Sequence, residues 1–286
     1  MKLQRFSKAI FLVSISLSLL ATLAAFGQVG RNDGLRSGRL FSIGPIPHFR
    51  KGVDAWPLIV SPQTPEVRRV NAILAAMNRQ TLASLRECDA DSRNYQAMSE
   101  RPKSRVSVSG DWTRKVTITM NGPRFVSMIA DETQVCTGAY PLNAFIPVVF
   151  DLKTGERIDW KLLSPAGTSI DAVAEQSSDG TSSPGLYIPS LMEMAVSRAD
   201  RECKHAMQDF NDVGRNSNLP FVVWPDARRG LLMTKASGLP HVVQACEEKI
   251  GLTIAEARKL RFSEELLDNL EQANQAVLAA QRKRTE

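Results

Sequence analysis

The 286-residue sequence is poor in the side chains that most often carry catalysis or bind metals. It has three histidines, three tyrosines and four cysteines. It also lacks the His-Glu-x-x-His, Gly-x-Ser-x-Gly and Ser-x-x-Lys motifs, which mark zinc peptidases and two large groups of serine enzymes. These absences predict a protein that is not an enzyme and that needs no metal or cofactor.

A concentrated basic surface is missing as well. The formal net charge is +6, and the basic residues are scattered along the chain without interleaved aromatic residues. Nucleic-acid-binding domains usually gather such residues on one face or stripe. We therefore expect no nucleic-acid partner.

Only one long apolar run occurs, at the N-terminus. Three basic residues precede the run "AIFLVSISLSLLATLAAF", and "AFGQ" places small residues before Gln28. This three-part pattern is typical of a secretory signal peptide. We predict that residues 1–27 are removed, that no membrane span remains, and that the mature protein is periplasmic or secreted. The alternative is an uncleaved anchor, for which the run is short and weakened by serines.

The cysteine count fits that compartment, because an even number of cysteines in an oxidising environment usually forms disulfides. Four cysteines permit three pairings, and their number alone does not choose among them. They are Cys88, Cys136, Cys203 and Cys246.

The mature chain predicts an α+β fold, with helices packed on one face of an antiparallel sheet. Residues 28–55 are rich in Gly, Arg and Ser and predict a flexible leader. Thr64 and Pro65 suit the start of a helix, whose apolar face recurs from Val67 until the helix ends near Cys88. We expect the folded domain to span residues 56–262.

Residues 104–130 alternate between apolar and polar, which predicts strands with one buried face. That face holds Val106, Val108, Val116, Ile118, Met120, Val126 and Met128. Residues 136–163 predict a cysteine-anchored turn and a strand in which Pro147 marks an edge or bulge. A hairpin follows, in which Gly155 takes a positive φ and joins "VVF" to a strand at "RIDW".

The last third of the chain predicts further helices and strands. A helix is expected over residues 188–209, followed by two strands joined by the turn Pro225-Asp226-Ala227. Thr253 and Glu256 have the spacing of a capping box. Residues 263–286 predict a C-terminal amphipathic helix.

Three segments together resemble an exported bacterial domain of unknown function. They are "WPLIVSPQTPEVRRVNAILAAM", "CTGAYPLNAFIPVVFDLKTGERIDWKLLSP" and "FVVWPDARRGLLM". That domain forms the ectodomain of a lysozyme-sensing anti-sigma factor and accompanies some peptidoglycan deacetylase domains. Its sharpest motif is a Gly-Ala-His-Pro turn before a Phe-Asp-Leu-x-Thr-Gly hairpin, which matches Gly138, Ala139, Pro141, Phe150, Asp151, Leu152, Thr154 and Gly155. Tyr140 stands where the family usually has histidine.

The resemblance implies an α+β fold and a wall-facing or lysozyme-facing role without catalysis. It favours an exported binding or sensing protein whose partner is envelope glycan or a lysozyme-like protein. Two alternatives remain. One is an envelope-glycan hydrolase or deacetylase with an unrecognised site, and the other is a structural envelope protein whose final helix engages a partner.

Several residues suggest chemistry and also have simpler explanations. Asp151, Glu156 and Asp159 could form a carboxylate pair for glycan hydrolysis, but polar residues near a turn are usually solvated. Cys203, His205, His241 and Cys246 could bind zinc, but disulfide formation competes for the thiols. Trp56, Trp112, Trp160 and Trp224 could stack on sugars, although their large apolar area favours the core for at least two of them.

We expect the disulfides Cys88–Cys136 and Cys203–Cys246. Cys88 ends the first helix and Cys136 begins the turn of the sheet that this helix covers, whereas Cys203 lies on the second long helix and Cys246 follows the late strands. If the domain binds a partner, we expect Thr137, Gly138, Tyr140 and Pro141 to take part, because a turn tied at both ends loses little entropy on binding. The alternative is that Tyr140 packs over Pro141 and closes the sheet.

Overall fold

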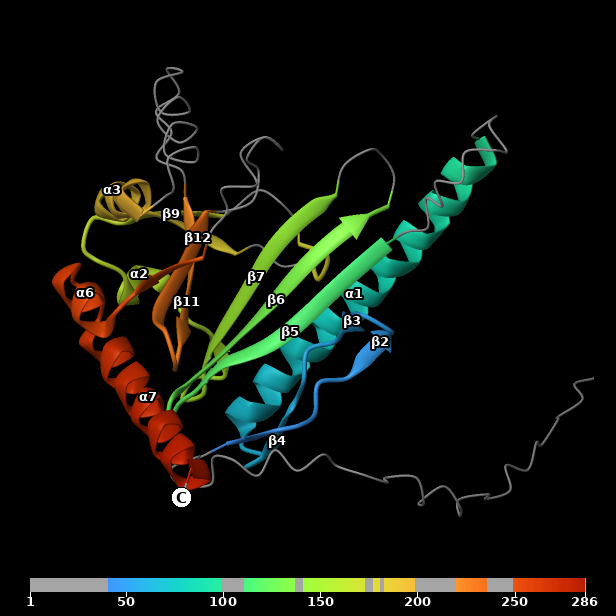
Figure 1. Ribbon diagram of the computed structural model, residues 1–286. Coiled ribbons are helices and arrows are strands. Elements are labelled where there is room, and N and C mark those ends of the chain that lie inside the picture. Colours follow the sequence, from blue (N-terminus) through green and yellow to red (C-terminus); the bar gives the residue numbers. More distant parts are fainter. Residues whose placement is uncertain are drawn as a thin grey trace, which may run out of the picture. The chain divides into compact units, whose positions relative to one another are not determined.

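The computed structural model has the α+β architecture that the sequence predicts (Figure 1). It describes residues 41–98, 111–136, 141–172, 177–180, 183–198, 220–235 and 249–285. Within these ranges no helix is long and apolar enough to cross a membrane. The predicted signal peptide, residues 1–27, lies outside the described residues.

The larger sheet has six strands among the described residues, in the order β2-β3-β5-β6-β7-β8. Its strands are β2 (His48–Arg50), β3 (Val53–Asp54), β5 (Asp111–Asn121), β6 (Phe125–Val135), β7 (Leu142–Asp151) and β8 (Glu156–Arg157). All neighbours are antiparallel except β3 and β5, which pair in parallel at Val53 and Arg114. The turn at Asn121-Gly122-Pro123 joins β5 to β6, as predicted.

A second sheet of five described strands has the order β13-β12-β11-β10-β9 and is antiparallel throughout. Among the described residues, a two-stranded ribbon pairs with neither of these sheets. The second sheet comprises β9 (Ser169–Ala172), β10 (Pro184–Tyr187), β11 (Phe221–Asp226), β12 (Gly230–Lys235) and β13 (Ile250–Leu252). The ribbon pairs β1 (Ser42–Ile43) with β4 (Ile59–Ser61).

The helices within the described residues lie on both faces of the larger sheet, not on one face as the sequence predicts. One face packs against the long first helix, and the other packs against the second sheet and the remaining helices. The first helix is α1 (Pro65–Met98), and the others are α2 (Trp160–Leu163), α3 (Pro189–Arg198), α6 (Ile254–Lys259) and α7 (Glu264–Thr285).

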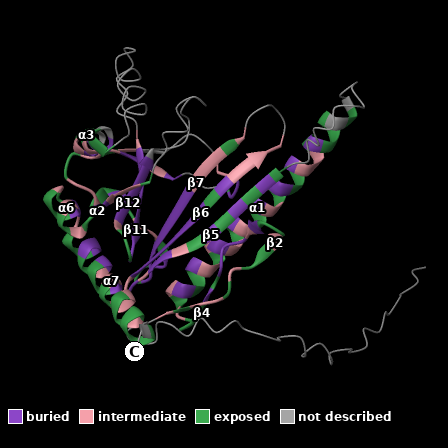
Figure 2. Cartoon of the chain, in the orientation of Figure 1, coloured by how far each residue is buried: buried purple, intermediate pink, exposed green. Residues whose placement is uncertain are grey.

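The face under α1 is apolar near the start of this helix. Val67, Val70, Leu74 and Met77 are buried against alternate residues of β6 and β7. Burial of each such side chain contributes about 1.5–3 kcal/mol relative to exposure. Figure 2 shows this as a line of buried residues along α1 and along the strands beside it.

The opposite face joins the two sheets. Phe125, Ile129 and Val149 pack with β10–β13, α3, α6 and α7 in the largest apolar cluster. Met120 belongs to this cluster and not to the α1 face where its spacing predicts it. A register shift between Ile118 and Met120 changes the phase of the alternation, as a β-bulge does.

Residues 41–55, predicted to belong to a loose leader, are part of the fold. They contribute β1, β2 and β3, and Val53 and Ala55 are buried. Strands of two or three residues leave almost no alternation to detect. The prediction of a leader is therefore wrong from residue 41 onward, and residues 28–40 lie outside the described ranges.

The first helix continues ten residues past its predicted end near Cys88 and reaches Met98. Beyond Leu85 its buried face is carried by Cys88 and Ser92, which are small, so the apolar pattern fades while the helix continues. The later helix was predicted over residues 188–209; α3 covers Pro189–Arg198, and residues 199–209 lie outside the described ranges.

The predicted hairpins and caps are otherwise present, except that the β11–β12 turn spans residues 227–229, because Pro225 and Asp226 pair with β12 within the sheet. Gly155 has a φ of +76° in the β7–β8 turn. Pro147 pairs with Ile129 of β6, and because β8 pairs only with Phe150 and Asp151 among the described residues, Pro147 lies on an unpaired edge of β7, as predicted. Thr253 and Glu256 form a capping box at the start of α6. The strand expected at "RIDW" is only two residues long, because Asp159 accepts a hydrogen bond from the Lys161 backbone N–H and caps α2.

Candidate functional site

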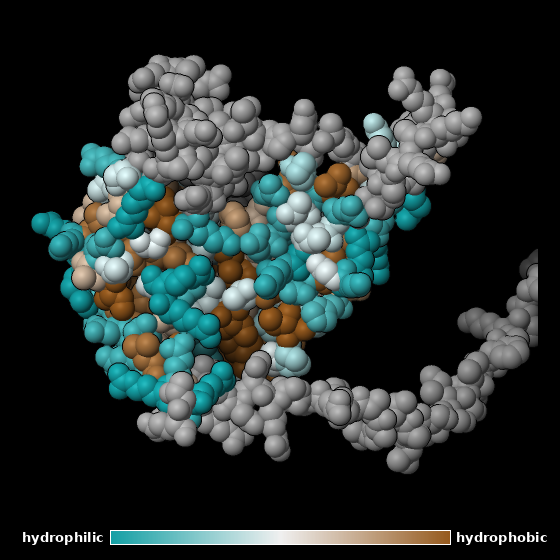
Figure 3. All heavy atoms as spheres, viewed as in Figure 1, coloured by the Kyte–Doolittle hydropathy of each residue, from teal (hydrophilic) through white to brown (hydrophobic). Residues whose placement is uncertain are grey.

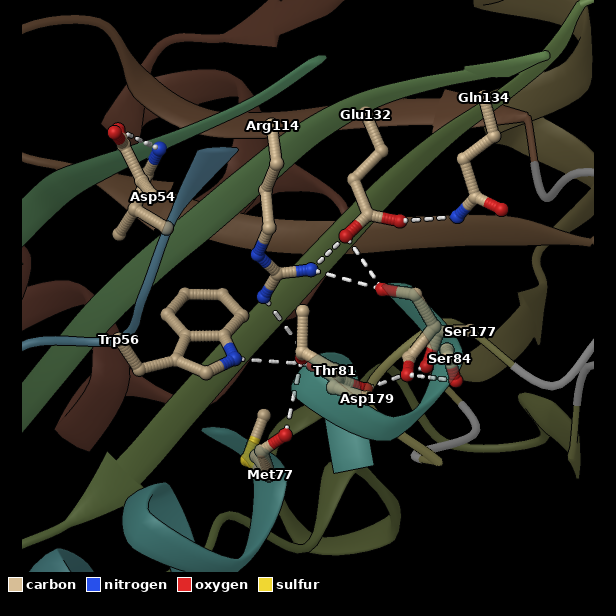
Figure 4. A network of polar contacts seen from close by, with 12 residues as sticks. Asp54, Trp56, Met77, Thr81, Ser84, Arg114, Glu132, Gln134, Ser177 and Asp179 are labelled. Carbon is tan, nitrogen blue, oxygen red and sulfur yellow. Dashed lines mark hydrogen bonds and ion pairs between the residues drawn. The ribbon is translucent and has the colours of Figure 1, made fainter. Parts of the chain in front are cut away.

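A buried polar network lies between α1 and the larger sheet (Figure 4). Its centre is the ion pair of Arg114 on β5 and Glu132 on β6, whose side chains are 0% and 1% exposed. These two residues are directly opposite each other in the β5–β6 register. On the other side of β6, Glu132 is opposite Ala144 of β7.

A short segment of the β9–β10 connection, residues 177–180, reaches this row. The Ser178 hydroxyl donates a hydrogen bond of 2.6 Å to Glu132 and accepts one of 3.1 Å from Arg114. Its carbonyl oxygen accepts a hydrogen bond of 3.0 Å from Ser84 of α1. The strands β9 and β10 belong to the second sheet, whereas residues 177–180 contact α1 and the α1 face of the larger sheet.

Asp179 is the second carboxylate of the network. Its Oδ2 accepts a hydrogen bond of 3.0 Å from the indole N–H of Trp56 and lies 3.6 Å from Nη2 of Arg114. Its Oδ1 accepts a hydrogen bond of 2.6 Å from the Ser177 hydroxyl. The Arg114 guanidinium also lies over the Trp56 ring, 4.8 Å from the ring centroid, at the distance of a cation–π contact.

The network extends along β6 and toward β3. Gln134 donates a hydrogen bond of 2.9 Å to the second oxygen of Glu132, so both oxygens of this carboxylate are bonded. Asp54 accepts the backbone N–H of Val116 at 2.9 Å and pairs with His48 at 2.7 Å. His48 lies on β2 and is 64% exposed, and its ring is held beside β3 by this contact.

Burial dominates the electrostatics of the two guanidinium groups. It lowers the pKa of Arg114 to about 10, although the charges of Asp179 and Asp54 raise it. Burial also lowers the pKa of Arg157, against the charge of Asp179. Both groups keep their protons at neutral pH, so Asp179 lies in the field of one buried cation, Arg114, and one half-buried cation, Arg157. Buried charges are tolerated when they are paired in this way.

The alternation of side chains along β5 and β6 contains a signal for this network that can be found in the sequence. Arg114 lies two residues from both Trp112 and Val116, and Glu132 lies two residues after Ala130. Side chains two residues apart on a strand point to the same face. The buried face of each strand therefore contains one charged residue, and the charges are opposite. Asp179 gives no comparable signal because it lies in a Ser-rich loop.

The predicted binding turn lies mostly outside the described residues. Thr137, Gly138 and Tyr140 are not described, and Pro141 is half-buried. The residues on either side of it are well defined. Cys136 is bonded to Cys88, with a Cα–Cα distance of 4.8 Å, which confirms this disulfide. On the other side of the turn, Leu142 is 67% exposed.

The disulfide is reinforced by neighbouring contacts. The Ser92 hydroxyl of α1 donates a hydrogen bond of 2.6 Å to the carbonyl oxygen of Cys136. Val53, Leu85 and Trp112 pack around the disulfide in a small apolar cluster. The last residues of β6 are thereby fixed to α1.

The other candidate residues have structural roles where they are described. Asp151 accepts two hydrogen bonds from Arg124, at 3.0 and 2.6 Å, and Asp159 caps α2, while Glu156 is exposed. Trp56, Trp112, Trp160 and Trp224 are at most 5% exposed and present no open face to a sugar. The suggested zinc ligands and second disulfide, Cys203, His205, His241 and Cys246, lie outside the described residues. Among the described residues, no group of three or more His, Cys, Asp or Glu side chains is placed to hold a metal ion.

Comparison with known proteins adds no relative. No protein-family model matches the chain, and no curated protein matches it.

Proposed function

We propose that this chain is an exported, non-catalytic binding protein of the cell envelope. Its partner is a protein of lysozyme type, which contacts the β6–β7 end, defined here as the end of the hairpin that carries Cys136 and Leu142. The observation that carries this proposal is the pairing of a fixed base with an exposed apolar residue. Cys136 is covalently fixed to α1, and Leu142 is 67% exposed at the other side of the same turn.

The fixed base lowers the cost of binding. Ordering a side chain or a loop on association costs binding free energy, which a preorganised surface avoids. Here the disulfide and the hydrogen bond from Ser92 to Cys136 hold one end of the turn. Ten β6–β7 residue pairs, ending at Gln134 and Leu142, hold the other end.

The exposed residues favour a protein partner over a glycan. Leu142 offers aliphatic surface without a hydrogen-bonding group, and a hydrophobic area lies at this end of the hairpin in Figure 3. Tyr95 is 45% exposed on α1, one turn beyond Ser92. Aliphatic and aromatic anchors of this kind are typical of protein interfaces.

Two further observations support export and the absence of catalysis. A disulfide between residues far apart in sequence is typical of an oxidising compartment. The buried carboxylates of the network, Glu132 and Asp179, are bonded to Arg114, Trp56 and serine hydroxyls. These bonds support a role in stabilising the fold and not in transferring protons to a substrate. The resemblance of the sequence to an ectodomain that senses lysozyme points to the same partner.

The proposal is tested by titrating the mature protein with a lysozyme and, separately, with solubilised peptidoglycan fragments. We expect saturable binding of the lysozyme and no release of products from the fragments. Binding of the fragments alone would replace the proposed partner with a glycan. Turnover of the fragments would show that the protein is an enzyme and would overturn the proposal.

A further inference from the structure

The surroundings of Asp179 are those of a carboxylate-binding site. The indole N–H of Trp56 and the hydroxyl of Ser177 each donate a hydrogen bond to one carboxylate oxygen, and the Arg114 guanidinium lies 3.6 Å away. The charge of Arg157 also acts on Asp179. Guanidinium groups are the usual partners of bound carboxylates because several of their N–H donors point in one plane.

The segment that supplies this carboxylate is hydrogen-bonded to the rest of the protein through polar groups. Residues 177–180 read Ser-Ser-Asp-Gly and contain no apolar side chain. Their contacts use one carboxylate, two hydroxyls and one carbonyl oxygen. A small polar solute could not reproduce the contacts of an apolar side chain. It can reproduce those of a carboxylate flanked by hydroxyl groups.

Arg114 also has hydrogen-bonding capacity to spare. Its Nη1 donates to Glu132 and Ser178, but Nε and Nη2 make no hydrogen bond to any described residue, although Nη2 is within ion-pair distance of Asp179. The side chain is fully buried. An unbonded buried donor destabilises the folded state, and a ligand oxygen that approached Nη2 more closely than Asp179 does would remove part of that penalty.

We infer that Trp56, Arg114 and Arg157 together form a carboxylate-binding site that the chain fills with its own Asp179. Residues 177–180 are then a displaceable plug, and the competing ligand is a carboxylate that carries hydroxyl groups, such as an acidic sugar. This site is separate from the β6–β7 end, and the inference does not depend on the proposed lysozyme partner.

The first test uses Asp179→Ala, which removes the carboxylate and leaves its place empty. Glycolate, a hydroxylated carboxylate, should raise the melting temperature of this variant by several degrees, since a ligand that binds only the folded state stabilises it. Sodium chloride at equal ionic strength should not. Asp179→Asn is the matched control, because its amide fills the same space and should abolish the response to glycolate.

The second test uses the wild-type protein and remains valid if the alanine variant does not fold. Saturating glycolate should increase amide hydrogen exchange in residues 177–180, while exchange in β5 and β6 stays unchanged. The inference is wrong if Asp179→Ala folds and does not respond to glycolate. It is also wrong if exchange of this segment in the wild type is unaffected, because Asp179 is then a fixed part of a structural ion cluster.

Discussion

The indole N–H of Trp56 donates a hydrogen bond of 3.0 Å to the carboxylate of Asp179, across 123 positions of the chain. The bond joins the N-terminal strands of the larger sheet to the β9–β10 connection of the second sheet. Both side chains are buried, so no water replaces the bond if the donor is lost.

We predict that Trp56→Phe destabilises the protein more than Trp224→Phe does. Both indoles are fully buried, and both changes remove the same atoms. The N–H of Trp224, however, has no hydrogen-bond partner among the described residues. Loss of a donor to a buried carboxylate should add about 1–3 kcal/mol to the cost of Trp56→Phe. Urea denaturation of the two variants measures the difference, and equal losses would contradict the assigned bond.

Glu132→Gln should be among the most destabilising changes on the α1 face. It keeps the shape of the side chain but leaves the Arg114 charge without its closest partner. Breaking a buried ion pair from one side costs about 3–5 kcal/mol. Arg258→Gln is the control, because Arg258 pairs with Glu264 at the surface, where ion pairs contribute little to stability. Similar losses for the two variants would show that the network contributes little.

The Arg124–Asp151 contact should make stability depend on pH in the acid range. Burial raises the pKa of Asp151, but hydrogen bonds from Arg124 and from the Lys153 backbone, with the charges of both residues, lower it overall below 3.8. A lowered pKa means that the contribution is complete above the unfolded-state pKa and is lost as the pH falls through the folded-state pKa.

Asp151→Asn is therefore expected to cost about 1.5–3 kcal/mol at neutral pH, as for hydrogen bonds to a charged group. The difference from the wild type should begin to shrink below about pH 4, where the carboxylate becomes protonated in the unfolded state, and should be lost as the pH falls through the lowered folded-state pKa. Denaturation curves at several pH values provide the measurement. A difference that stays constant down to about pH 2 would contradict the assigned role of the charge.

Removal of the Cys88–Cys136 disulfide should destabilise the whole protein, not only the hairpin end. The bond closes a loop with a sequence separation of 48, for which the loss of unfolded-chain entropy corresponds to about 4 kcal/mol. The double variant Cys88→Ala/Cys136→Ala should show this loss in denaturation without reductant. A loss below about 1 kcal/mol would contradict this prediction, because the hydrogen bond from Ser92 to Cys136 forms only in the folded state and does not restrict the unfolded chain.

The parts of the fold that sequence patterns predicted are those set by local chemistry. The start of α1 follows from Thr64 and Pro65, the β7–β8 turn from Gly155, and the cap of α6 from Thr253 and Glu256. Each of these depends on residues only a few positions apart. Their energetic preferences are therefore visible in the sequence itself.

The features that were missed depend on distant residues. The parallel pairing of Val53 with Arg114 places β3 in the larger sheet. The two residues of β3 are too few to form a pattern that predicts this pairing. The polar network brings Trp56, Glu132 and Asp179 together around Arg114 from four separate segments. Burial on both faces of the larger sheet likewise depends on where the second sheet packs, which alternation within one strand does not encode.

The measurement that tests the central claim most directly compares Leu142→Ser with Leu162→Ser in binding to lysozyme. Both leucines are exposed, at 67% and 76%, but only Leu142 lies at the proposed surface, whereas Leu162 lies on α2. Loss of one buried leucine contact corresponds to about 1.5–3 kcal/mol, or about a 10- to 100-fold weaker affinity. We predict this weakening for Leu142→Ser alone, with an unchanged melting temperature in both variants. Unchanged affinity of Leu142→Ser, or an equal loss in Leu162→Ser, would contradict the assignment of the β6–β7 end as the binding surface.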